Sequence, residues 1–231
     1  MSGLRELGPG LWVAEAPLRF AGIEVGRRMN VIQLAGGGLF VHSPAPLDEA
    51  LRAGLGALGE VRFVAAPSRL HGNLWMEQYV AAYPGVELLA APGLAERRKD
   101  LDFAAELGSE PDPRWADDLD QELFRGNRLL SEVVFLHRAS RSLIVGDLAL
   151  NLGPESPRLT RVLARAGAMH GRLRPTPLFR ALTRDRAAAR ASLERILSWD
   201  FDRVVVGHGA IWESGGREAL RREWSRVLSA R

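Results

Sequence analysis

Two short apolar runs, each followed by a glycine and a polar residue, constrain the fold of this chain more than any other feature. Residues 202–206 lead into Gly207 and His208, and residues 142–145 lead into Gly146 and Asp147. Aliphatic and β-branched runs of this length predict buried strands. Polar side chains at the ends of rigid strands are a common way to build a functional site. His208 and Asp147 are therefore the first candidates for such a site.

Further apolar runs bounded by glycine and proline predict a series of strands. Residues 35–37 and 138–141 each join two such runs and predict hairpins. The expected strands are 11–15, 29–34, 38–43, 61–66, 86–90, 121–124, 132–137, 142–145 and 202–206. Between them, the acidic and proline-broken residues 106–120 predict a surface connection with about one helical turn.

Apolar residues at three- and four-residue spacing predict helices between these strands. The expected helices are 48–58, 75–82, 93–99, the region 154–198 in two parts divided at Pro175 and Pro177, and 218–228. This alternation predicts an α/β fold, and the two successive strand groups suit a four-layer αββα sandwich. The two sequence halves meet near residue 120 without a flexible linker, so we expect one domain over residues 1–231.

The composition is that of an ordinary globular protein, with 46% hydrophobic and 26% charged residues. No apolar run is long enough to span a bilayer, and the N-terminus lacks the layout of a signal peptide, so we expect a cytoplasmic protein with no membrane partner. The net charge of +3 is spread along the chain, which disfavours a nucleic-acid partner. Without cysteine, a bound metal ion would need His, Asp, Glu or Asn ligands.

Several short motifs, in their order along the chain, resemble the metallo-β-lactamase fold superfamily. They are Arg28-Met29-Asn30-Val31-Ile32-Gln33-Leu34, Val41-His42-Ser43-Pro44, Ala66-Pro67-Ser68-Arg69-Leu70-His71, Tyr83-Pro84 and Leu123-Phe124-Arg125-Gly126-Asn127. More narrowly, they resemble a little-characterised branch that carries a domain of unknown function. The resemblance covers nearly the whole chain.

This resemblance implies a reduced metal site. Of the superfamily's H-x-H-x-D-H loop only His71 remains, and Asp147 and His208 match the bridging aspartate and the final histidine. Asn127 stands where the superfamily has a further histidine, and His42 with its neighbour replaces an early aspartate. The implied ligands of one divalent ion, such as zinc, iron or manganese, are thus His71, Asp147 and His208. A metal-free site is the alternative.

Two functions follow from this resemblance. The first is a metal-dependent hydrolase for a small ester, amide or phosphate substrate, with Asp147 and Asn127 as catalytic residues and Arg69 and Arg125 holding an anionic group. The second is a catalytically inactive member of the fold that binds a small molecule or a protein partner. The metal content of the protein, and its loss on His208→Ala, discriminates between them.

Each candidate also has a purely structural interpretation. His208 and His71 could be turn histidines, Asp147 could cap a turn, and Asn127 could serve only the left-handed turn geometry that asparagine tolerates. The role of His42 stays open. No role is expected for His137 and His170, and the larger aromatic residues are interpreted as core, namely Trp75, Trp199, Trp212 and Trp224.

Overall fold

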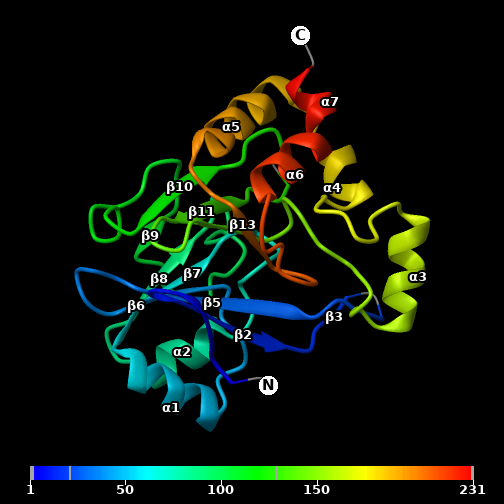
Figure 1. The fold of residues 1–231 in the computed structure, drawn as a ribbon. Coiled ribbons are helices and arrows are strands. Elements are labelled where there is room, and N and C mark those ends of the chain that lie inside the picture. The colour runs from blue at the N-terminus through cyan, green and yellow to red at the C-terminus, as the bar shows by residue number, and fades with distance from the viewer. Residues whose placement is uncertain (1–2, 21, 128, 230–231) are drawn as a thin grey trace.

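The computed structural model describes residues 3–20, 22–127 and 129–229 (Figure 1). In these ranges the first half of the chain forms a seven-stranded sheet in the order β1-β2-β5-β6-β7-β8-β9. From β6 to β9 neighbouring strands are parallel, whereas the N-terminal strands pair antiparallel. The strands are β1 (Arg5–Gly8), β2 (Leu11–Ala16), β5 (Arg27–Gln33), β6 (Leu39–His42), β7 (Val61–Ala66), β8 (Glu87–Ala90) and β9 (Ala105–Glu106).

The second half forms a four-stranded sheet in the order β10-β11-β12-β13. Its strands are β10 (Leu119–Leu123), β11 (Val133–His137), β12 (Ser142–Val145) and β13 (Arg203–Val206). The β12–β13 pair is parallel, so both strands end at the same edge of the sheet. A small ribbon of β3 (Arg19–Phe20) and β4 (Ile23–Glu24) extends from the N-terminal half.

Helices cover the outer faces of both sheets, which gives four layers (Figure 1). Leu51 and Leu55 of α1 and Tyr79 of α2 pack on the first sheet. Leu193 and Ile196 of α5 pack on the second sheet together with α4 and α6. The helices are α1 (Glu49–Leu58), α2 (Met76–Ala82), α3 (Arg158–Ala166), α4 (Pro177–Leu182), α5 (Arg186–Ser198), α6 (Gly216–Glu223) and α7 (Ser225–Leu228).

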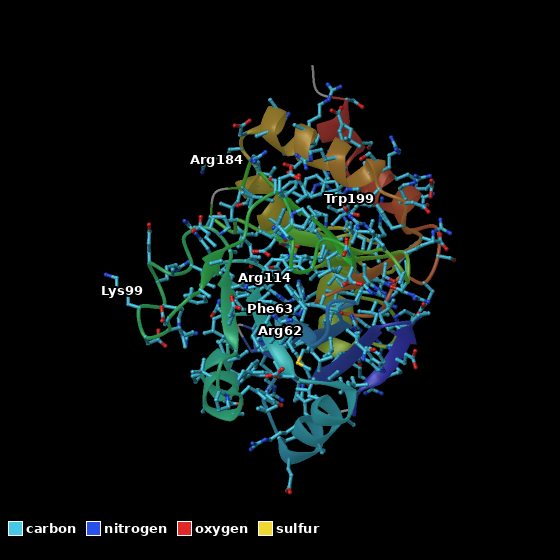
Figure 2. The ribbon with its side chains drawn as sticks, turned by 90° about the vertical axis from the view of Figure 1, so that its left-hand side faces the viewer. Arg62, Phe63, Lys99, Arg114, Arg184 and Trp199 are labelled. Atoms are coloured by element: carbon cyan, nitrogen blue, oxygen red, sulfur yellow. The ribbon has the colours of Figure 1, made fainter. Side chains whose placement is uncertain are left out.

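Between the sheets lies an apolar core of alternate residues from both, as the period of two in strands requires. Phe40 and Phe63 of the first sheet meet Trp115, whose ring centroid lies 5.3 Å and 5.2 Å from theirs. Figure 2 shows Arg62 and Arg114 beside Phe63, and both guanidinium groups lie over its ring. The segment predicted as a surface connection therefore also contributes Trp115 to the core, and Ala105–Glu106 extends the first sheet.

Several predicted helices differ in detail. Residues 93–99 form turns rather than a helix, because Gly93 has φ 75° and the chain turns back through the bond from Leu94 N to Ala91 O. The region 154–198 contains three helices rather than two, and the predicted C-terminal helix divides at Trp224 into α6 and α7. In the described part of the chain, no helix is both long and apolar enough to cross a membrane.

Candidate functional site

The candidate residues follow the carboxyl ends of two parallel strand pairs. The loop after β7 carries His71, the residue after β6 is Ser43, and Asp147 and His208 follow β12 and β13. Because parallel strands end at one edge of their sheet, and the two sheets face each other, these ends meet at one edge of the sandwich. The bond from Arg28 N to Gly207 O, at 3.0 Å, joins the sheets there.

His71, Asp147 and His208 form a cluster at this edge, and His208 and Asp147 are its outer part. Nε2 of His208 lies 3.8 Å from Oδ1 of Asp147, and the His208 side chain is 10% exposed. Nδ1 of His208 lies 2.6 Å from the carbonyl oxygen of Gly26. Since a carbonyl oxygen only accepts hydrogen bonds, Nδ1 carries a proton, which in the neutral ring leaves the lone pair on Nε2. Nε2 is therefore the ring nitrogen of His208 that faces Asp147.

His71 lies behind His208, with the ring centroids 4.9 Å apart and the ring planes at 81°. Its position depends on local turn chemistry, since Ser68 Oγ accepts a bond from His71 N at 2.8 Å. Ser43 Oγ lies 2.9 Å from Nδ1, and Nε2 has no hydrogen-bond partner. Burial lowers the pKa of His71 well below its usual value, and the charges of His208, Arg27 and His42 lower it further. His71 is therefore neutral at neutral pH.

Glu132 is a member of this cluster that the sequence analysis did not identify. Its buried carboxyl group accepts bonds from the backbone amides of Gly146 at 2.7 Å and of Asp147 and Leu148 at 2.8 Å. Burial raises the pKa of Glu132 to about 8, and the charge of Asp147 acts in the same direction. Burial also raises the pKa of Asp147, while His208 opposes that rise. Glu132 thus holds the loop that positions Asp147.

Asn127, Arg69 and Arg125 make contacts away from the cluster. Nδ2 of Asn127 donates to Phe179 O at 3.2 Å, and its Oδ1 accepts from Leu130 N at 3.4 Å, so Asn127 stabilises a turn. Nε of Arg69 donates to Pro92 O at 2.9 Å. Arg125 is half exposed and bonds Ser109 Oγ at 3.1 Å. The structure does not bring these three side chains to the imidazole groups.

His42 is buried in the first sheet. Its Nδ1 lies 3.1 Å from the amide nitrogen of Asn30 on the neighbouring strand, and its ring meets the edge of Phe135 across the sheets. His137 is likewise buried and bonds Ser140 Oγ at 2.7 Å. Both histidines thus have packing and hydrogen-bonding roles inside the sandwich.

The buried His42 makes stability depend on pH. Burial, with the charge of Arg27, lowers its pKa from 6.5 to about 3. Between these values the unfolded chain binds a proton that the native protein excludes, so the free energy of unfolding falls as the pH falls. Between pH 6 and pH 4 we expect the wild type to lose about 1.4 kcal/mol more per pH unit than His42→Gln, which cannot titrate. Urea unfolding measures both slopes, and equal slopes would contradict this assignment.

The fit of a metal ion can be tested on these contacts. Two imidazoles and a carboxylate suit a divalent ion chemically. Their arrangement does not, because His71 Nε2 faces the backbone of Gly207, where an added Cβ would lie only 2.5 Å away. Among the residues that the structure describes, no three His, Asp or Glu side chains form a group that could hold a metal ion. The side chains in this arrangement therefore do not fit the ion.

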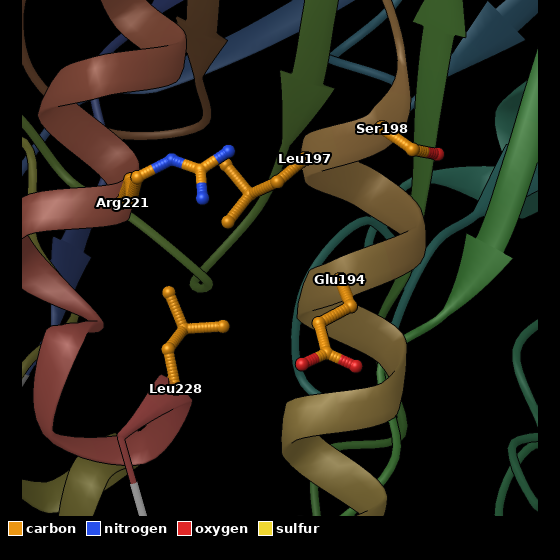
Figure 3. A pocket seen from close by; sticks show the side chains of 5 residues that line it. All are labelled: Glu194, Leu197, Ser198, Arg221 and Leu228. Carbon is orange, nitrogen blue, oxygen red and sulfur yellow. The ribbon is translucent and has the colours of Figure 1, made fainter.

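A cavity of about 840 Å³ opens beside His208. Its wall includes Gly207 and Gly209 on either side of His208, and Gly26, whose carbonyl oxygen binds that ring. Ligand cavities in proteins commonly have this size. A smaller cavity of about 360 Å³ lies between α5 and the C-terminal helices (Figure 3), lined by Glu194, Leu197, Ser198, Arg221 and Leu228. The side chains of His71, Asp147 and His208 belong to the lining of neither cavity, and only the first cavity has the neighbours of His208 in its wall.

Solved structures with this architecture define its class. The metallo-β-lactamase from Pontibacter korlensis matches 98% of this chain and 99% of its own, with 13% identity and a TM-score of 0.65. The metallo-β-lactamase FIM-1 from Pseudomonas aeruginosa, in a mono-zinc form, matches 98% and 96%, with 11% identity and 0.63. The Flv1 flavodiiron core from Synechocystis matches 98% and 60%, with 11% identity and 0.63. The fold is therefore that of the metallo-β-lactamase superfamily.

Within that superfamily the sequence identifies a narrower group. The family model described as Domain of unknown function (DUF4336) matches residues 10–179, and the chain belongs to this family. No curated protein is similar enough in sequence to match it. These findings confirm the fold and the branch that the sequence motifs predicted.

Proposed function

We propose that this protein binds a small molecule at the strand edge around His208 without a metal ion. The observation that carries the proposal is the large cavity whose wall includes Gly207 and Gly209 on either side of His208, combined with imidazole groups that contact each other instead of converging on one ion. The sequence analysis had kept this function as the alternative to a hydrolase.

The cavity wall contains polar residues that can hold such a molecule, among them Arg27, Arg28 and Asn151. The His208 ring lies behind this wall and fixes the Gly26 part of it, because its Nδ1 bonds Gly26 O. Asp147, whose pKa is raised by burial, lies 3.8 Å from Nε2 of His208 behind this wall. Arg28 supports the cavity wall by donating to Val206 O and to Gly209 O, and it pairs with Glu15.

A second candidate is the metal-dependent hydrolase that the superfamily resemblance implies. It is favoured by the meeting of His71, Asp147 and His208, which come from three separate strand ends, at one place. In this arrangement His71 Nε2 would have to move away from Gly207 before the three side chains could share an ion. The metal content of the protein therefore decides between the two candidates.

The test uses protein purified without a metal-affinity tag and then supplied with zinc, iron or manganese. We expect far less than one ion per chain by elemental analysis, and the same low value for His208→Ala, because the three side chains do not share an ion. About one ion per chain that is lost in His208→Ala would overturn the proposal and support the hydrolase. Lys99→Ala, distant and exposed at the surface (Figure 2), is the control for adventitious binding.

A further inference from the structure

Arg27 is a buried cation without a charged partner among the described residues. Its residue is 4% exposed, and its buried Nε and Nη2 atoms have no hydrogen-bond partner in the part of the chain that the structure describes. In the described ranges no carboxylate forms an ion pair with it, whereas the next residue, Arg28, binds Glu15 at 2.7 Å and two backbone carbonyls. Burying a charge without a partner is costly, so such a group usually has a counter-ion.

The guanidinium group of Arg27 is held in place by Trp75. Its central carbon lies 4.7 Å from the ring centroid of Trp75, a cation–π contact. Trp75 has φ 63° directly before α2, a left-handed conformation that is rare for a bulky residue. Backbone strain of this kind persists only where the surrounding structure imposes it, and it is concentrated at ligand-binding sites. Trp75 was predicted to belong to the core, and instead it is half-buried against an arginine.

Arg27 lines the same cavity as the glycines around His208. Its charge also acts on the neighbouring imidazoles, since after burial and the charge of His208 it lowers the pKa of His71 further. The cavity is also lined by Glu15, Glu24, Glu155 and Glu213, all of them exposed. Of these, Glu15 pairs with Arg28 and Glu213 with Arg203. The buried part of the wall therefore contributes positive charge, and the acidic groups lie at the rim.

We propose that Arg27 recognises an anionic group, a phosphate or a carboxylate, on the small molecule that occupies this cavity. This inference rests on the proposed function and names the ligand class for that site. An arginine provides several N–H donors in one plane, which match the oxygens of both anions. The anion would supply the counter-charge that the described residues of the protein do not supply.

The experiment measures binding of inorganic phosphate and of succinate by isothermal titration calorimetry, with a chelator present. We expect at least one of the two anions to bind at millimolar concentration. In Arg27→Met, which removes the guanidinium group but keeps a long unbranched side chain, affinity should fall about tenfold or more. Arg5→Met removes an equal charge from an exposed position on the same cavity and is the matched control, with an expected loss of less than about threefold. Tighter binding of phosphate would indicate a ligand with a phosphate group, and tighter binding of succinate would indicate a ligand with a carboxylate group.

Arg27→Met should fold, because it removes a buried unpaired charge, and thermal unfolding verifies this. Arg27→Lys keeps the charge without the planar donors and should bind with intermediate affinity. Equal losses in Arg27→Met and Arg5→Met, or no binding of either anion with the chelator or with added zinc, would overturn the inference. Anion binding that appears only when zinc replaces the chelator, and that is weakened in Arg27→Met, would instead contradict the proposed function and leave the role of Arg27 supported, so the two failures are distinguishable.

Discussion

Replacing Glu132 by alanine is expected to lower the free energy of unfolding by about 3–5 kcal/mol. The reason is that its carboxyl group accepts the amides of Gly146, Asp147 and Leu148 inside the protein. Alanine leaves all three donors buried without an acceptor, and an unsatisfied buried donor costs about 1–3 kcal/mol. Urea unfolding at pH 7 measures the loss.

Glu132→Gln is the graded control for this prediction. The amide has nearly the same shape and keeps one acceptor oxygen, so the expected loss is about half that of alanine. A loss below about 1 kcal/mol for Glu132→Ala would mean that water or a rearranged loop satisfies the amides. In that case Glu132 would not be what positions Asp147.

Gly207→Ala is expected to destabilise the protein by about 2–3 kcal/mol, because it overpacks the centre of the cluster. The added Cβ would lie 2.5 Å from Nε2 and 2.8 Å from Cε1 of His71. The ring is held on its other side by Ser43 Oγ, so it has little freedom to retreat. Thermal and urea unfolding measure the cost, and anion binding reports whether the cavity wall moves.

Gly146→Ala provides a matched control against the same ring. There the added Cβ would lie 3.3 Å from Cγ of His71, so the expected cost is less than about 1 kcal/mol. Removing the ring tests the cause directly, since Gly207→Ala should cost little in a His71→Ala background. If Gly207→Ala destabilises both backgrounds equally, the clash with His71 is not the reason.

The sequence predicted most elements of the fold because their signals are local. The strands ending before Gly146 and Gly207 are continuous apolar runs, and the leucines of α1 recur at helical spacing. Short elements such as β9, with two residues, carry too little pattern to be found. The turns at 93–99 depend on a positive φ at Gly93, which outweighs the apparent helical pattern.

For the candidate site, His208 and Asp147 stand out in the sequence by their places after strands, whereas His71 was a candidate through the superfamily resemblance. Asn127 shows that a matching motif position does not determine a residue's contacts. It occupies the place of a superfamily histidine, yet it bonds Phe179 O and Leu130 N. Glu132, in contrast, matches no position of the superfamily motifs. It reaches the amide of Asp147 because β11 pairs with β12. Arg27 and Arg28 are adjacent in sequence, and nothing in their order indicates that, among the described residues, Arg28 alone of the two has an ion-pair partner.

The order of apolar runs, glycines and prolines in the sequence by itself determined the layered α/β architecture. It also determined the sheet edge at which polar residues gather, since burial and strand period depend on local composition. The tertiary structure alone decided what those residues can do. Hydrogen-bond partners, the close approach of Gly207 to His71, and the burial of Arg27 without a counter-ion in the described ranges arise between segments far apart in the chain. Distances of a few tenths of an ångström decide such contacts, and residue type alone does not specify them.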